Sequence, residues 1–128
     1  MTITLGNVGH FSLAERDPER SARFWTENFD LEEDFRFEDG IAISNRDITI
    51  ALFKGKPDPD ALEHLSFHLK DMNELNAALD QLKKSNVQLE DPGDEIGPEA
   101  PGSPHMGLWF HDPDGYRWEL SVQNAAST

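Results

Sequence analysis

The sequence predicts an α+β protein in which a βαβββ module occurs twice, at about residues 6–56 and 61–124 of a single domain covering residues 1–128. The first observation is a repeated motif, His-apolar-Ser-apolar, which starts at His10 and again 54 residues later at His64. Each copy alternates apolar and polar residues with a period of two, as a half-buried strand does. The second observation is that a helix signal follows each copy at the same distance.

These helix signals are two aspartates, each seven residues after the motif histidine. Asp17 followed by Pro18 is typical of an N-cap with proline at the first helical position. Asp71 and Glu74 have the spacing of a capping box, with Asp in place of Ser or Thr. Apolar residues then follow on one helical face, namely Ala22, Trp25 and Phe29 in the first module and Leu75, Ala78, Leu79 and Leu82 in the second.

Three further strands are expected after each helix. They lie at about Glu33–Phe37, Ile41–Ser44 and Ile48–Phe53 in the first module and at Val87–Leu89, Met106–Phe110 and Arg117–Val122 in the second. Residues 112–115, Asp-Pro-Asp-Gly, suit a tight hairpin turn, and the stretch 91–104, rich in Pro, Gly and acids, predicts a long exposed loop. We expect Trp25 and Trp118 in the core and Tyr116, beside the turn, at the surface.

The composition limits the partners and the chemistry. With 25 acidic and 11 basic residues, the net charge is −14, which argues against binding to nucleic acids or to anionic membranes. The sequence shows neither a signal peptide nor a transmembrane segment, so we expect a cytoplasmic protein with a small-molecule substrate. It contains no cysteine, which excludes disulfides and thiolate ligands and leaves His, Asp and Glu for chemistry.

Two histidines and one glutamate are candidate metal ligands. His10 and His64 hold equivalent positions early in the opening strands, so they would face each other across one cavity if the modules packed about a pseudo-twofold axis. Glu119 lies in the middle of the last expected strand, where a carboxylate must face solvent or find a partner. Together the three form a 2-His-1-carboxylate set, which binds a divalent metal and leaves positions open for substrate. The alternative is that each histidine is an ordinary hydrogen-bonded core or surface residue.

Three segments resemble the vicinal oxygen chelate superfamily, which includes glyoxalase I, extradiol dioxygenases, fosfomycin-resistance transferases and bleomycin-resistance proteins. They are Val8–Leu13, Glu63–Phe67 and Phe110–Leu120, and the most specific element is Asp-Pro-Asp-Gly-x-x-x-Glu at 112–119. The resemblance implies the glyoxalase/bleomycin resistance/dioxygenase fold, in which paired modules form a cup-shaped mixed sheet. It also implies a homodimer.

The resemblance places the metal ligands at His10, His64 and Glu119, and the metal would be Fe, Mn, Ni or Zn. Glyoxalase I has a fourth ligand, a glutamate, at the position of Ala51, so an isomerase of that kind would lack its base. Methylmalonyl-CoA epimerase is disfavoured by the same difference. The three-ligand pattern resembles extradiol dioxygenases and fosfomycin transferases more closely.

These two groups also differ from the chain. Both have a tyrosine at the position of Trp109, and the fosfomycin transferases have a threonine at that of Ser12. The acid–base histidine of the extradiol enzymes would fall within Arg46–Phe53, which contains no histidine.

Several residues could take up catalytic roles. Ser12, Ser66 and His68 share a strand face with the expected ligands. His105, Trp109 and His111 share a face of the adjacent strand. The candidate catalytic residues are therefore Ser12, together with His68 or His105 as a general base. The alternative is that these histidines are structural or solvent-facing.

The leading hypothesis is a divalent-metal-dependent enzyme that acts on a small substrate with two adjacent oxygens, in a dioxygenase- or lyase-like reaction. The alternative is a metal-free binding protein of the bleomycin-resistance type, in which the same site holds an aromatic ligand. A third alternative, a non-enzymatic structural or stress role, stays open.

Overall fold

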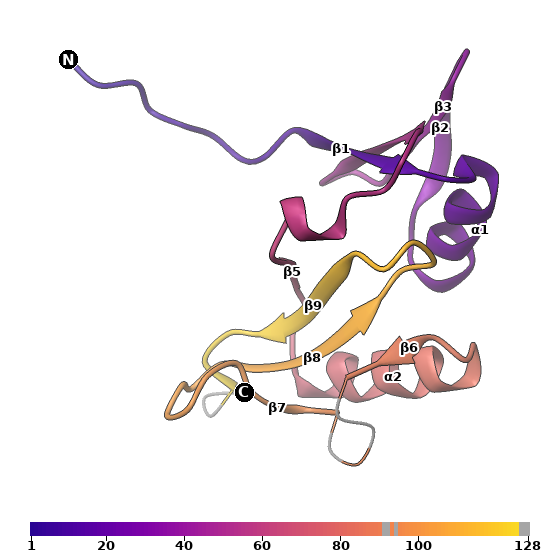
Figure 1. Cartoon of the computed structure of the whole chain (residues 1–128). Coiled ribbons are helices and arrows are strands. Elements are labelled where there is room, and N and C mark those ends of the chain that lie inside the picture. Colours follow the sequence, from indigo (N-terminus) through magenta and orange to yellow (C-terminus); the bar gives the residue numbers. More distant parts are fainter. Residues whose placement is uncertain (91–92, 94, 126–128) are drawn as a thin grey trace. The chain divides into compact units, whose positions relative to one another are not determined.

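The strands and helices form two units, Met1–Pro57 and Asp58–Thr128, each with its own sheet and its own α-helix (Figure 1). The computed structural model describes residues 1–90, 93 and 95–125. Within these residues, no helix has both the length and the apolar character that crossing a membrane requires.

The first unit contains a four-stranded sheet in the order β1-β4-β3-β2. Its strands are β1 (His10–Glu15), β2 (Glu32–Phe37), β3 (Gly40–Ser44) and β4 (Thr49–Lys54), and α1 (Pro18–Asn28) connects β1 to β2. Strands β1 and β4 pair in parallel, whereas the other pairs are antiparallel. Helix α1 begins where predicted, because the side chain of Asp17 accepts the backbone N–H groups of Glu19 and Arg20.

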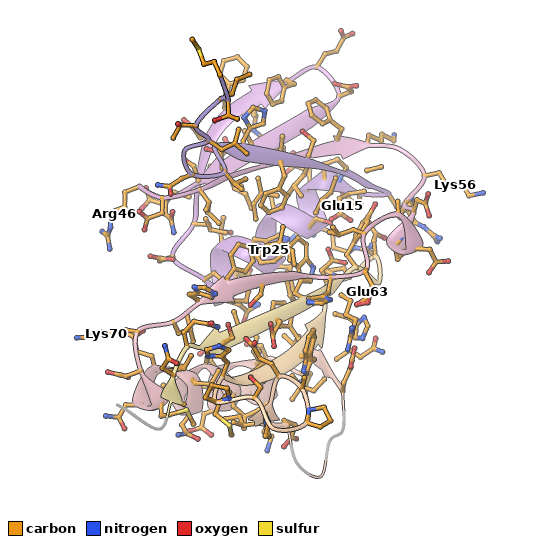
Figure 2. All side chains as sticks on the ribbon, turned by 90° about the vertical axis from the view of Figure 1, so that its left-hand side faces the viewer. Glu15, Trp25, Arg46, Lys56, Glu63 and Lys70 are labelled. Carbon is orange, nitrogen blue, oxygen red and sulfur yellow. The ribbon has the colours of Figure 1, made fainter. Side chains whose placement is uncertain are left out.

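One face of the first sheet packs against α1 and forms the core of the unit. The buried side chains include Trp25 of the helix and a row of aliphatic residues, Leu13, Ile41, Ile43, Ile50 and Leu52. Figure 2 shows Trp25 inside the unit, whereas Arg46 and Lys56 point outward. The residues that alternate with the core on β1, His10 and Ser12, are exposed on the opposite face.

The second unit repeats this arrangement. Its sheet has the order β5-β9-β8-β6, with β7 also paired to β8. The elements are η1 (Pro59–Ala61), β5 (Leu65–His68), α2 (Met72–Lys84), β6 (Gln88–Leu89), β7 (Gly97–Pro98), β8 (Met106–His111) and β9 (Arg117–Val122). Strands β5 and β9 pair in parallel, as β1 and β4 do. The predicted α+β class with βαβββ modules is therefore confirmed, and Trp118 lies in the core as expected.

The register shows that the two units are equivalent at their first strands. Ser12 of β1 lies opposite Ala51 of β4, and Ser66 of β5 lies opposite Glu119 of β9. His10 begins β1, whereas His64 directly precedes β5, one residue outside the strand in which the sequence placed it. The same face of each sheet therefore carries a His-x-Ser motif, and only the second carries a carboxylate beside it.

Three details differ from the sequence predictions. The capping box of α2 is shifted, because Asp71 accepts the N–H of Glu74 at 2.9 Å while Glu74 accepts the N–H of Lys70 at 3.0 Å. The expected loop 91–104 contains β7, which gains backbone hydrogen bonds by pairing with β8; residues 91, 92 and 94 of that prediction lie outside the described residues. The surface assignment of Tyr116 was wrong. Tyr116 is 4% exposed, and its hydroxyl accepts the N–H of Asp58 at 3.1 Å.

Candidate metal centre

One face of the second sheet is apolar and the other is polar, because β9 alternates between the two kinds of residue. Trp118, Leu120 and Val122 are buried on one face, and α2 packs against β8 and β9. On the other face, Glu119 lies opposite Trp109 of β8 and next to Ser66 of β5. The polar face therefore gathers the residues from which a site could be built.

The carboxylate of Glu119 is the most unusual group on this face. The residue is only 2% exposed, and burial raises the pKa of its carboxyl, while a hydrogen bond from Ser66 and the nearby His64 act in the opposite direction. Among the described residues, Oε2 of Glu119 has no hydrogen-bond partner. A buried carboxylate oxygen without a partner is costly, so this atom is available for a cation.

Gly107 provides the space for this carboxylate. A Cβ atom at Gly107 would lie 2.5 Å from Oε2 of Glu119 and 3.2 Å from the carbonyl oxygen of Leu120. The carboxylate therefore packs against the backbone of β8 at Gly107, and a side chain at position 107 would displace it. A glycine inside a strand is a recognised sign of such a close approach, so Gly107 was a usable sequence signal for it.

A chain of hydroxyl and amide groups approaches Glu119 from one side. Ser66 Oγ lies 3.0 Å from Ser121 Oγ. The side-chain amide of Gln123 donates to Ser121 Oγ at 3.2 Å and to Glu99 Oε1 at 3.1 Å. This chain of hydrogen bonds lies next to Glu119 on the polar face, because Ser66 is the register partner of Glu119. Oε2 of the carboxylate is not part of it and has no hydrogen-bond partner among the described residues.

His64 directly precedes β5, and its charged form lowers the pKa of the Glu119 carboxyl. Its Nδ1 is 2.7 Å from Oε1 of Glu63, and its ring meets that of Trp109 edge to face, with centroids 4.8 Å apart. The hydrogen bond lowers the pKa of Glu63, which therefore stays an ionised acceptor at neutral pH. The neutral ring then carries its proton on Nδ1, and Nε2 has a free lone pair.

These donors fit a divalent metal ion, because an imidazole nitrogen and a buried carboxylate oxygen are ligands that such ions prefer. Among the residues that the structure describes, no group of three or more His, Asp or Glu side chains is arranged to hold a metal. Two residues of the predicted ligand set, His64 and Glu119, lie in the second unit. The third, His10, is exposed at the start of β1 in the first unit.

The predicted catalytic residues lie in both units. Ser12 is exposed on β1, on the same face as His10. His68 is exposed at the end of β5, opposite Ser121. His105 accepts the backbone N–H of Asn124 on Nδ1 at 2.9 Å, so its neutral ring carries the proton on Nε2 and would act as a donor from that atom. Their catalytic roles stay predictions.

Sequence reasoning missed three charged residues beside the candidate site. Glu63 contacts His64, Arg117 contacts Glu63, and Glu90 contacts Arg117. Arg117 shares a strand face with Glu119, and this alternation was a usable signal. The partners of Arg117, however, lie 27 and 54 residues away in sequence. No local pattern indicates contacts of that range.

The fold and the site define a class of proteins with repeated βαβββ modules and a carboxylate and imidazoles on the open sheet face. The comparisons agree, since residues 7–120 match the family model of the Glyoxalase/Bleomycin resistance protein/Dioxygenase superfamily. The chain therefore belongs to this superfamily, and the resemblance seen in the sequence is confirmed.

Solved structures of similar fold include a genomically encoded fosfomycin resistance protein, FosX, from Listeria monocytogenes, with 16% identity, coverage of 93% of this chain and 94% of that chain, and a TM-score of 0.75. A lactoylglutathione lyase from Agrobacterium tumefaciens is 14% identical, with coverages of 94% and 96% and a TM-score of 0.74. A glyoxalase-related enzyme from Fulvimarina pelagi is 22% identical, with coverages of 93% and 89% and a TM-score of 0.68. No curated protein matches the chain. At these identities the likeness supports the fold alone.

Proposed function

We propose that the protein is a divalent-metal-dependent enzyme that acts on a small substrate with two adjacent oxygens, in a dioxygenase- or lyase-like reaction. The observation that carries the proposal is the buried Oε2 of Glu119, which lacks a partner among the described residues and lies near His64. An unsatisfied buried polar atom costs about 1–3 kcal/mol, and more when charged. A cation bound at this oxygen would offset that cost.

The proposed ligands are His10, His64 and Glu119, with Fe, Mn, Ni or Zn as the metal. When bound, such an ion acts as a Lewis acid on substrate oxygens. We assign His10 because its His-x-Ser motif is equivalent to that of His64, and the superfamily resemblance supports this assignment. It could come from the same chain or from a second copy, since we also propose a homodimer.

The residues around the ligands suggest separate roles. His105 is proposed as a hydrogen-bond donor through Nε2, because its Nδ1 accepts the N–H of Asn124. His68 is proposed as a general base, since it shares a strand face with Ser66 and is open to solvent. Ser12 is proposed to contact the substrate beside His10.

Thermal unfolding with added metal tests this proposal. Metal-free protein should gain several degrees in Tm with Mn, Fe, Ni or Zn, because a ligand that binds only the folded state stabilises it. The variants His64→Ala and Glu119→Gln should lose this gain, whereas His68→Ala, a nearby histidine outside the ligand set, should keep it. An unchanged Tm of the wild type with all four metals would contradict the proposal.

A second candidate function, metal-free binding of an aromatic ligand, is favoured by a cluster of phenylalanines in the first unit. Phe35 and Phe37 are 60% and 40% exposed. The ring centroids of Phe35 and Phe37 are 5.0 Å apart, and those of Phe37 and Phe53 are 5.1 Å apart. The register places all three on the sheet face that carries Ser12.

Binding of a neutral fluorescent aromatic probe distinguishes the two functions. For a binding protein, Phe35→Ala should abolish binding, while a chelator and His64→Ala should have no effect. Probe binding that depends on added metal would favour the enzyme.

A further inference from the structure

Arg117 is the centre of a group of ion pairs beside the candidate metal centre. Its Nε donates to Glu90 Oε1 at 2.7 Å and its Nη2 donates to Glu90 Oε2 at 3.1 Å. Its Nη1 donates to Glu63 Oε1 at 2.9 Å. The guanidinium therefore holds one carboxylate with two parallel hydrogen bonds and still reaches a second, which is the geometry that arginine provides and lysine does not.

Glu90 anchors Arg117 from the other side. Besides its two bonds to Arg117, its Oε1 lies 3.0 Å from Nε2 of His111, whose Nδ1 lies 3.3 Å from the carbonyl oxygen of Gly115. The side chains of Glu90 and Arg117 are each about one-third exposed or less. Arg117 is thus held by a partly buried network rather than by a single surface contact.

Two separate contacts connect Arg117 to His64. The first runs through Glu63, whose Oε1 accepts from both Arg117 and His64 Nδ1. The second runs through Trp109. The Arg117 guanidinium lies 4.1 Å from the centroid of the Trp109 ring, and the same ring packs edge to face with the imidazole of His64. One arginine therefore supports both the hydrogen-bond acceptor of His64 and the aromatic ring beside it.

Glu63 needs this support. Its side chain is 70% exposed, and an exposed ion pair between two mobile side chains holds neither of them firmly. A carboxylate that is itself bound by a fixed arginine loses less freedom when it accepts from the imidazole. Metal-binding histidines commonly donate their second ring nitrogen to a carboxylate, which sets the tautomer and the ring orientation.

We infer that Arg117 and Glu63 are positioning residues for His64: they hold its ring as the Nδ1–H tautomer and so keep Nε2 free to bind a metal. The inference deepens the proposed function and, in its metal-binding arm, rests on it. Neither residue contacts the metal or the substrate in this account. Their role is to hold the imidazole ring of His64 in one orientation and one tautomer before a metal ion binds.

The first unit offers a matched control. Arg36 also joins two glutamates, because it pairs with Glu19 and with Glu33. Its side chain is half exposed, and within the described part of the chain its hydrogen-bond partners are glutamates and not a histidine. Loss of Arg36 should therefore remove a similar pair of salt bridges without affecting a histidine.

The first test is long-range 15N NMR of the histidine rings in metal-free protein, at alkaline pH where the rings are neutral. Wild-type His64 should be mainly the Nδ1–H tautomer. Arg117→Met and Glu63→Ala should shift it toward the Nε2–H form that dominates in free solution, whereas Glu63→Gln, whose amide oxygen still accepts, should retain the wild-type tautomer. Arg36→Met should also leave it unchanged. An unchanged tautomer in Glu63→Ala and Arg117→Met would overturn the inference.

The second test is the Kd for Mn²⁺ or Zn²⁺ measured by calorimetry. We expect it to rise about 10–100-fold in Arg117→Met and Glu63→Ala and to stay at the wild-type value in Arg36→Met. Unfolding curves identify any variant that fails to fold, and Glu63→Gln provides the conservative replacement that should bind normally.

The two tests separate failure of the inference from failure of the proposed function. If the wild type binds metal and all the variants bind it equally well, the positioning role is overturned while the metal centre stands. If the tautomer shifts as expected but the wild type binds no metal, the hydrogen-bond role is supported and the metal-dependent function fails.

Discussion

The two units have the same strand arrangement, but they differ at one equivalent position. In the first, Ser12 lies beside Ala51, and in the second, Ser66 lies beside Glu119. The alanine is a small apolar side chain that is 6% exposed, whereas the glutamate brings a carboxyl group to a position that is 2% exposed. Because the fold forms with either residue, the carboxylate is not required by the architecture. Its presence in only one unit favours a functional role.

The units also differ in what their arginine pairs support. Arg36 and Arg117 each join two glutamates, but only Arg117 reaches a carboxylate that accepts from a histidine. Similar ion pairs are therefore an exposed surface contact in the first unit and part of the surroundings of a candidate site in the second. The predictions that follow test this contrast.

The largest effect is expected at Gly107. In Gly107→Ala the added Cβ would come within 2.5 Å of Glu119 Oε2 and 3.2 Å of the Leu120 carbonyl oxygen, so the carboxylate must move. We expect a loss of about 1–3 kcal/mol in the free energy of unfolding, together with weaker metal binding. Gly97→Ala is the control, because a Cβ there meets nothing within 4 Å. Urea unfolding and metal titration measure both effects, and equal results for the two variants would contradict the account.

Glu119→Gln should have a smaller effect on stability and in the opposite direction. Burial raises the pKa of the Glu119 carboxyl above its usual 4.5, so the stability this group contributes is present at low pH and is lost as pH rises through the raised pKa. The neutral glutamine avoids that loss. Metal-free Glu119→Gln should therefore exceed the wild type by about 1–2 kcal/mol at neutral pH.

Urea unfolding at several pH values measures this difference. The gap between Glu119→Gln and the wild type should close as the pH falls below about 4.5. A variant that is less stable than the wild type at neutral pH would show that the carboxylate is satisfied in the metal-free protein.

The smallest effects are expected at the helix N-caps, where the two units should behave alike. Asp17→Ala and Asp71→Ala each remove the capping contacts to the first turn and should each cost about 1 kcal/mol. We also predict that the two units unfold as one domain, so both variants should shift the same single calorimetric transition. Two transitions, each moved by only one of the variants, would contradict the single-domain prediction.

Local chemistry made much of the fold predictable. Asp17 is the N-cap of α1, as predicted, and β9 has the predicted bounds, Arg117–Val122. The His-x-Ser repeat correctly indicated that the two modules begin with equivalent strands. Cap residues and alternating strands are read over a few neighbouring residues, so one sequence is enough to find them.

Features that depend on distant contacts could not be predicted in the same way. Tyr116 is buried because its hydroxyl meets the backbone of Asp58, 58 residues earlier. The bonds from Arg117 to Glu63 and Glu90 likewise join residues that are 54 and 27 positions apart in the sequence. The sequence could indicate which face a side chain takes, as it did for Glu119, but it contains no distances between strands.

The most direct test of the central claim is the metal content of protein purified without added metal, measured by mass spectrometry for the wild type and for Glu119→Gln. We expect about one Mn, Fe, Ni or Zn ion per site in the wild type and none retained by Glu119→Gln. His68→Ala should retain the wild-type content. A wild type that contains no metal and takes up none when it is supplied, or a Glu119→Gln variant that keeps its metal, would contradict the claim that Glu119 binds a metal ion.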